Sequence, residues 1–291
     1  MYFLQQIIQG VSLGSIYGLV ALGYVLIWQA WGVLNFAQGE MCAIGAFAMM
    51  VLHMECNLPI YVALPLAIVV SMAVGLVIEL LAFRPLVKTN DTNKLIATIG
   101  VSICVRNLLR MIFGADAFAF PSIFGDKPIS IGGLIIVPQN IWNIVFGFGL
   151  VLLLTLFLKK TRLGKAMRAT AQDREAARLM GVNVRHSLTG TFVIASSMGA
   201  IAGMLIAPIY LMMASMGGSL GTKGFAAAVL GGIDFASGAM VGGIILGVSE
   251  CLAAGYGSSA YQSAIAYIVL FLALVIRPSG IMSRKKNVEK V

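Results

Sequence analysis

The sequence has 291 residues, of which 59% are hydrophobic and only 11% are charged, and its mean hydropathy is +0.96. Soluble domains are about half apolar and about a quarter charged, so this composition excludes that class. The formal net charge of +9 does not indicate nucleic-acid binding, because basic residues collect in the cytoplasmic loops of membrane proteins. The chain is therefore expected to fold as an all-α, polytopic membrane bundle.

Apolar runs of about 20 residues, the length of a helix that spans a bilayer, predict the elements in chain order. No basic n-region precedes the first run, so it is expected to remain as a span rather than to be cleaved as a signal peptide. The number of spans is about eight or nine, depending on whether the glycine-broken pair crosses twice or forms one re-entrant hairpin. The expected spans are about 7–28, 35–53, 59–83, 95–113, 133–158, 189–213, the pair within 224–256, and 260–277.

Basic residues orient these spans. Sixteen of the twenty Lys and Arg residues fall in three regions, 84–94, 159–185 and 277–290. Even numbers of crossings separate the three regions, so all of them are expected to face the cytoplasm. Arg106 and Arg110 instead lie within a span, on one helix face, where they either snorkel outward or pair with an acid from another helix.

Glycines recur at a spacing of four residues inside the apolar runs. Small residues at this spacing let helix backbones approach closely in lipid, where hydrophobic attraction between helices is absent. The pattern predicts a tightly packed bundle. It occurs at Gly10/Gly14/Gly18, Gly199/Gly203, Gly238/Gly242 and Gly243/Gly247.

Two short stretches resemble each other. NFAQGEM, residues 35–41, and DFASGAM, residues 234–240, share four identities. Either a parallel internal repeat that relates about 10–60 and 220–256, as in many transporters, or chance explains the likeness. Asn35 and Asp234 are both expected to cap the helices that follow them.

Polar side chains within apolar spans are candidates for a solute pathway, because burying them in lipid is costly. A helix cap or a hydrogen bond between helices is the alternative role for each. The pathway candidates are Asn35, Gln38, Glu40, Asp234 and Glu250.

Catalytic chemistry is not indicated. The sequence has no G-x-S-x-G, H-E-x-x-H or G-x-x-x-x-G-K-[ST] motif, and His53 and His186 are expected on opposite sides of the membrane. The four cysteines form no C-x-x-C pair and are expected to be buried apolar residues. We therefore expect no catalytic residues, no metal and no cofactor, and active transport would need an ion gradient or a separate ATPase.

One loop, 159–188, carries a compact charged segment, AQDREAARLMGVN. Thr170 and Asp173 fit the [ST]-x-x-[DE] start of a helix, and Gly181 is suited to end it. Ala176, Ala177 and Met180 would form a small apolar face. Such a face, with Arg174 and Arg178 projecting on another side, suits docking into a partner.

The triplet Glu175-Ala176-Ala177 followed by Gly181 resembles the EAA loop of bacterial ABC importer permeases. Six longer stretches, in this order, make nearly the whole chain similar to the LivH-type permeases of branched-chain amino acid ABC importers. The chain departs from that pattern at 234–236, where a shorter Gly-Ser turn is typical. The stretches are SLGSIYGLVALGYVLIWQAWGVLNFAQGE, LIATIGVSI, GKAMRATAQDREAARLMGV, KGFAAAVLGGI, GAMVGGIILGVSE and RPSGI.

The resemblance implies a single permease domain over 1–291 in the bacterial inner membrane, with branched-chain amino acids as the solute. It also implies a second, LivM-like permease, two cytoplasmic ABC ATPase subunits, a periplasmic binding protein and no nucleic acid as partner. Urea, short-chain amides and other amino acids stay open as solutes, and an ion-coupled secondary transporter is the alternative class. The implied ATPase-coupling helix comprises Arg174, Glu175, Ala176, Ala177, Arg178, Met180 and Gly181.

Overall fold

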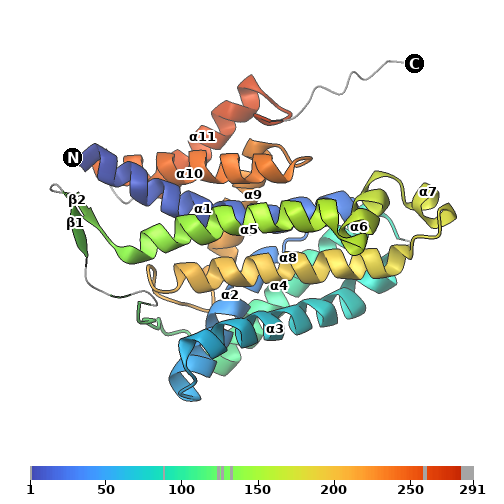
Figure 1. Cartoon of the computed structure of the whole chain (residues 1–291), viewed down its shortest axis with the longest axis horizontal. Coiled ribbons are helices and arrows are strands. Elements are labelled where there is room, and N and C mark those ends of the chain that lie inside the picture. The colour runs from blue at the N-terminus through green and yellow to red at the C-terminus, as the bar shows by residue number, and fades with distance from the viewer. Residues whose placement is uncertain are drawn as a thin grey trace.

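The computed structural model describes residues 2–87, 89–122, 125, 128–131, 134–257 and 261–282. Long helices lie side by side along its long axis, with the N-terminus at one end and two short helices, α6 and α7, at the other (Figure 1). The helices are α1 (Tyr2–Trp31), α2 (Gln38–Met50), α3 (Ile60–Ile78), α4 (Asp91–Phe113), α5 (Pro138–Lys160), α6 (Arg162–Gln172), α7 (Arg174–Leu179), α8 (Val184–Ile206), α9 (Met216–Gly231), α10 (Ala236–Tyr256) and α11 (Gln262–Ile276).

Six of the described helices are long and apolar enough to cross a bilayer: α1, α3 with its continuation to Leu86, α4, α5, α8 and α10. The helices α2, α9 and α11 have 13, 16 and 15 residues. The glycine-broken pair consists of α9 and α10, and the break lies at Gly232, whose φ of +103° favours glycine. The predicted polytopic helical membrane bundle is confirmed.

Two expected boundaries were wrong. The segment expected to start a span at 133 instead contains an antiparallel hairpin, β1 (Ile129–Ile131) paired with β2 (Leu134–Ile136), and α5 begins only at Pro138. Isoleucine-rich sequence is equally apolar as strand or helix, so hydropathy alone does not separate the two. The span expected over 189–213 runs over 184–206, because Asn183 caps its start by accepting a hydrogen bond from the His186 amide at 3.2 Å.

The helix α1 lies at the centre of the bundle, and its glycines face the glycines of α10. A Cβ added to Gly14 would lie 2.6 Å from the Gly243 carbonyl oxygen, and one added to Gly247 would lie 2.4 Å from the Gly14 amide nitrogen. Side chains at these positions would force the two backbones apart. The four-residue glycine spacing therefore forms a helix–helix contact, as predicted.

The helix α2 begins inside the bundle, beside the middle of α8. The Gln38 side-chain amide donates to the Ala195 carbonyl at 2.8 Å, and a Cβ on Gly39 would lie 2.2 Å from the Gly217 carbonyl oxygen of α9. The Asn35 Oδ1 accepts from the Ala37 amide at 3.0 Å and closes the turn before α2. The expectation that Asn35 and Asp234 cap the helices that follow them was wrong, because Ala37 precedes α2 and Phe235 precedes α10, and neither helix start has a side-chain cap.

The end of the bundle that carries α7 also gathers the basic regions. The Arg174 guanidinium donates to the Ala30 carbonyl at the end of α1 at 2.6 Å, and the Gln29 amide donates to the Asp234 carbonyl at 2.7 Å. The Ile281 amide, just after the last described helix, donates to the Leu230 carbonyl of α9 at 3.0 Å. By the positive-inside rule this end is expected to face the cytoplasm; Lys88 and the basic residues at 284–290 lie outside the described residues.

Candidate functional site

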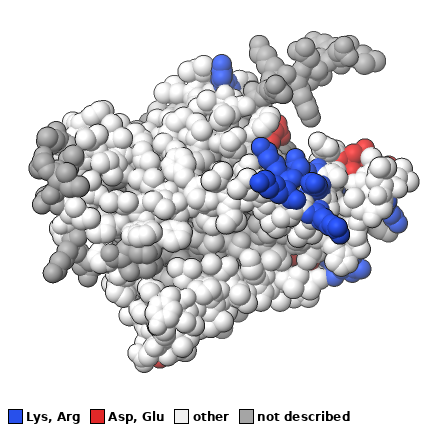
Figure 2. Space-filling view, in the orientation of Figure 1, with Lys and Arg blue, Asp and Glu red and all other residues white. Residues whose placement is uncertain are grey.

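The charged loop folds as two short helices. Figure 2 shows Lys and Arg side chains gathered at the end of the molecule that carries α6 and α7. The expected helix start at Thr170 was wrong: Thr170 is buried within α6, where its hydroxyl donates to the Ala166 carbonyl at 2.9 Å. The cap is Asp173, which accepts from the amides of Glu175 at 2.8 Å and Ala176 at 3.0 Å. Asp173 leaves the helical conformation and so separates α6 from α7.

The end of α7 follows the expected glycine stop. Gly181 has a φ of +80°, and its amide donates to the Arg178 carbonyl at 3.0 Å while the Val182 amide donates to the Ala177 carbonyl at 3.0 Å. This pair of bonds is the Schellman motif, which satisfies the last carbonyls of a helix. It fixes the direction in which the chain leaves α7 towards α8.

The faces of α7 differ from those expected. Ala177 is buried against its own bundle, and Arg174 does not project, because it reaches back to α1. Leu179 and Met180 are instead 88% and 85% exposed. Two large apolar side chains that project into solvent beside an acidic and a basic residue are typical of a docking surface. The outward face of α7 is formed by Ala176, Leu179 and Met180, and Glu175 and Arg178 are exposed beside it.

A groove of about 1310 Å³ separates α7 from the ends of α1, α3 and α8. Three buried polar atoms in its walls lack a hydrogen-bond partner: Trp31 Nε1, Glu79 Oε2 and Arg84 Nε. On the α7 side the groove is lined by Arg174, Glu175, Arg178 and Gly181. The exposed side chains of Ala176, Leu179 and Met180 do not line it.

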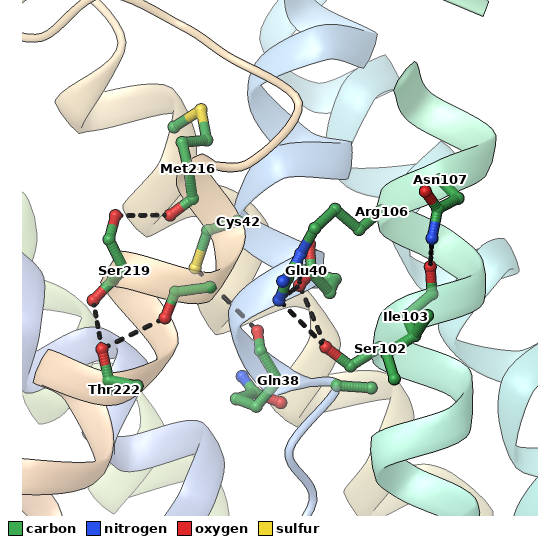
Figure 3. A network of polar contacts seen from close by, with 12 residues as sticks. Gln38, Glu40, Cys42, Ser102, Ile103, Arg106, Asn107, Met216, Ser219 and Thr222 are labelled. Atoms are coloured by element: carbon green, nitrogen blue, oxygen red, sulfur yellow. Dashed lines mark hydrogen bonds and ion pairs between the residues drawn. The ribbon is translucent and has the colours of Figure 1, made fainter. Parts of the chain in front are cut away.

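A polar cluster lies inside the bundle where α2, α4 and α9 meet (Figure 3). Glu40 is fully buried, and its Oε1 accepts from Arg106 Nη2 at 2.7 Å, from Arg106 Nε at 3.1 Å and from Ser102 Oγ at 3.0 Å. The Arg106 side chain is 39% exposed. The expectation that this arginine pairs with an acid from another helix is therefore confirmed.

A second polar cluster joins α1, α9 and α10. Lys223 forms an ion pair with the fully buried Glu250 and donates to the Tyr17 hydroxyl at 3.2 Å. The Tyr17 hydroxyl in turn donates to Glu250 Oε2 at 2.7 Å. The lysine side chain is 16% exposed, so in both clusters a cation lies on the outer side of a buried carboxylate.

The structure separates the five pathway candidates. Asn35, Gln38 and Glu40 are fully buried in one segment, and Glu250 is fully buried in the second cluster. Asp234 is exposed in the turn between α9 and α10, near the C-terminal end of α1. The four buried candidates form hydrogen bonds within the chain. The groups on the outer side of the two clusters are the cations Arg106 and Lys223, which pair with Glu40 and Glu250.

Sequence reasoning missed the part that α9 plays. Lys223, together with Ser219 and Thr222, belongs to the stretch GSLGTKG, whose only evident feature was a mismatch to an ATP-binding loop. The spacing of Ser215, Ser219 and Thr222 could have revealed this part of the chain. It puts three polar residues on one side of a helix, whereas the exposed side chains of the other long helices are mostly apolar.

Metal chemistry finds no support in the part of the chain that the structure describes, where no group of three or more His, Cys, Asp or Glu residues could hold an ion. All four cysteines are free, and Cys42 is buried as expected. Cys56 and Cys104 are exposed, contrary to the expectation for them.

Residues 6–274 match the family model described as "Branched-chain amino acid transport system / permease component". The chain is 37% identical to the "High-affinity branched-chain amino acid transport system permease protein LivH" of Salmonella typhimurium, an alignment that covers 100% of this chain and 98% of that protein. It is 36% identical to BraD of Pseudomonas aeruginosa, with the same coverage. A probable LivH of Methanocaldococcus jannaschii is 30% identical over 90% of this chain and 87% of its own length.

Proposed function

The chain belongs to the family of permease components of branched-chain amino acid transport systems, and from this premise we propose that it is the permease subunit of an ABC importer for branched-chain, aliphatic amino acids. The importer lies in the bacterial inner membrane. The observation that carries the proposal is the likeness to named permeases over the full chain, joined to a docking-type helix at the basic end. The partners are a second, LivM-like permease, two ATPase subunits and a periplasmic binding protein.

The coupling step follows from how α7 is held. An ATPase subunit that grips Leu179, Met180 and the adjacent charges would move α7 when the ATPase dimer closes on ATP. The contacts of Ala177 and the hydrogen bond from Arg174 to Ala30 would carry that movement to α1. Because α1 packs closely against α10 and contributes Tyr17 to the second polar cluster, a shift at its end would reach the middle of the bundle. This is an alternating-access switch between two global states.

An ion-coupled secondary transporter is less well supported. Such a carrier would use buried acids as its coupling sites. Glu40 and Glu250 are instead each paired with a cation of their own chain, and the docking helix would have no purpose.

Reconstitution of this chain with the second permease, the ATPases and the binding protein tests the proposal. ATP-dependent uptake of labelled leucine or valine into proteoliposomes is expected, with none when ATP or the binding protein is omitted. Uptake by this chain alone, driven by a proton or sodium gradient, would contradict it. Titration of the binding protein with amino acids, urea and amides identifies the solute.

A further inference from the structure

A polar stripe on α9 faces outward from the bundle. Ser219 and Thr222 of α9, and Ser215 at its N-cap, are exposed. With spacings of four and three residues, they lie on one side of the helix. Figure 3 shows Ser219 and Thr222 on the same side of α9, where their hydroxyls bond to backbone carbonyls of the first turns. Helix faces that meet lipid carry apolar residues, as the exposed Val145 and Leu152 of α5 do. The stripe is therefore suited to contact water or polar solute.

The stripe is flanked by the two cations of the polar clusters. On one side, a Cβ on Gly218 would lie 2.7 Å from Arg106 Nη2, so the guanidinium lies close against α9. On the other side, Lys223 follows Thr222 directly and ion pairs with Glu250. Each buried carboxylate thus fixes a cation that belongs to α9, as Lys223 does, or that lies against it, as Arg106 does.

The surroundings of Arg106 favour a negative group. A cavity of about 150 Å³ is lined by Arg106, Asn107, Arg110 and Ser215, among others. The first turns of α2 and α9 both lie at this cluster, since Glu40 belongs to the first turn of α2 and a Cβ on Gly217 of α9 would lie 2.3 Å from Glu40 Oε2. Helix N-termini carry partial positive charge, and broken helices that point their N-termini at an anionic solute group are a recurring transporter device. A carboxylate is of a size and charge to enter here.

We propose that the α9 stripe, Ser215, Ser219 and Thr222, lines the water-filled path of the solute, and that Arg106 binds the carboxylate of a zwitterionic amino acid as it passes. This inference rests on the proposed function and deepens it, because it selects solutes that carry a carboxylate over urea and neutral amides. Glu40 acts as a positioning residue that holds the guanidinium, and Ser102 supports the same carboxylate oxygen.

Thiol labelling in the assembled transporter tests whether the stripe is wet. In a variant without the four native cysteines, Ser219→Cys is compared with Leu152→Cys on the exposed apolar face of α5. Water-soluble methanethiosulfonates react with the thiolate, so the Ser219→Cys variant is expected to react at least about tenfold faster than the Leu152→Cys variant. Equal, slow reaction at both positions would show that lipid or dry protein covers the stripe and would overturn the proposal.

Charge selectivity tests the role of Arg106 in the same background. The Ser219→Cys thiol is labelled once with an anionic sulfonate reagent and once with a cationic trimethylammonium reagent. The anionic rate divided by the cationic rate reports the local electrostatic potential. Arg106→Gln is expected to lower this ratio by roughly threefold to tenfold, whereas Arg106→Lys keeps most of it. Arg162→Gln, on α6 at the basic end, is the matched control and leaves it unchanged. An unchanged ratio in the Arg106→Gln variant overturns the carboxylate assignment.

Transport assays separate this inference from the proposed function. The Arg106→Gln importer is expected to keep ATP hydrolysis stimulated by the loaded binding protein while amino acid uptake falls at least about tenfold, since a bidentate charged contact is lost. Wild-type importer that fails to take up any amino acid with ATP would count against the proposed function alone, because the labelling ratios are measured without transport. Full uptake by the Arg106→Gln importer would count against the inference alone.

Discussion

Single residues matter most in this protein where the backbone or a buried charge allows one side chain only. Gly181 is such a position, because its φ of +80° lies in the left-handed region. The space around it is open, since a Cβ there would meet nothing within 4 Å. A substitution at Gly181 therefore acts through backbone strain and not through a clash.

Gly181→Val is expected to lower ATP-driven uptake strongly while the chain still inserts in the membrane. A β-branched residue in the left-handed region costs roughly 1–2 kcal/mol and would change the direction in which the chain leaves α7. Gly181→Asn is the matched control, because asparagine tolerates this conformation, and it should retain most of the uptake. Equal uptake by the valine and asparagine variants would contradict the Schellman geometry as the cause.

The pair of Lys223 and Glu250 leads to a stability prediction. Removing one partner leaves an uncompensated buried charge, which costs about 3–5 kcal/mol, whereas replacing both partners is often close to neutral. Glu250→Gln and Lys223→Met should each lower the Tm of the purified chain in detergent. The double variant should recover much of that loss; additive losses in the cycle would show that the two side chains do not interact.

At the scale of the element, α7 has two faces that differ in their contacts. Ala177 and Arg174 hold it against the bundle, whereas Leu179 and Met180 project from it. A coupling element needs both properties, because motion passes only through a part that is gripped on one side and anchored on the other. Leu179 and Met180 also lie outside the triplet Glu175-Ala176-Ala177, of which Ala177 is buried.

Met180→Glu is expected to abolish uptake and leave the Tm of the chain unchanged, because a charge on the outward face prevents docking without touching the fold. Ala177→Leu should instead lower the Tm, since overpacking a buried site costs about 1–3 kcal/mol. Pull-down of the ATPase by each purified variant, together with its Tm, checks both outcomes. Normal ATPase binding by the Met180→Glu variant would rule out this face as the dock.

At the scale of the whole molecule, the contact between α1 and α10 joins the first and the last thirds of the chain. Its glycines let the two backbones touch over several turns, which brings Tyr17 within reach of Glu250. The second polar cluster thus exists only because the glycine contact is close. Stability and the proposed solute path therefore depend on the same packing.

Gly14→Leu is expected to lower both the Tm and the uptake, because its side chain would meet the backbone of Gly243 and Ile244 at 2.6 Å. Gly149→Leu on α5 is the control, since a Cβ there meets nothing within 4 Å. That variant should insert, remain stable and transport normally. A Gly14→Leu chain as stable as the Gly149→Leu chain would show that α1 and α10 do not pack through their glycines.

The sequence by itself determined the membrane class, the placement of most spans and the family. These features depend on local properties: apolar length, charge segregation and short ordered motifs are all read along the chain. The stop of α7 at Gly181 was predictable for the same reason, because a helix end is decided by its own few residues.

Only the tertiary structure decided which side chains meet. Glu40 and Arg106 are 66 positions apart, and no local pattern states that α2 begins inside the bundle beside α4 and α9. The orientation of Ala177 and Arg174 and the outward stripe of α9 depend in the same way on what packs behind each helix. A buried charge is stable only next to its partner, and the path of the backbone through all three dimensions decides which partner that is.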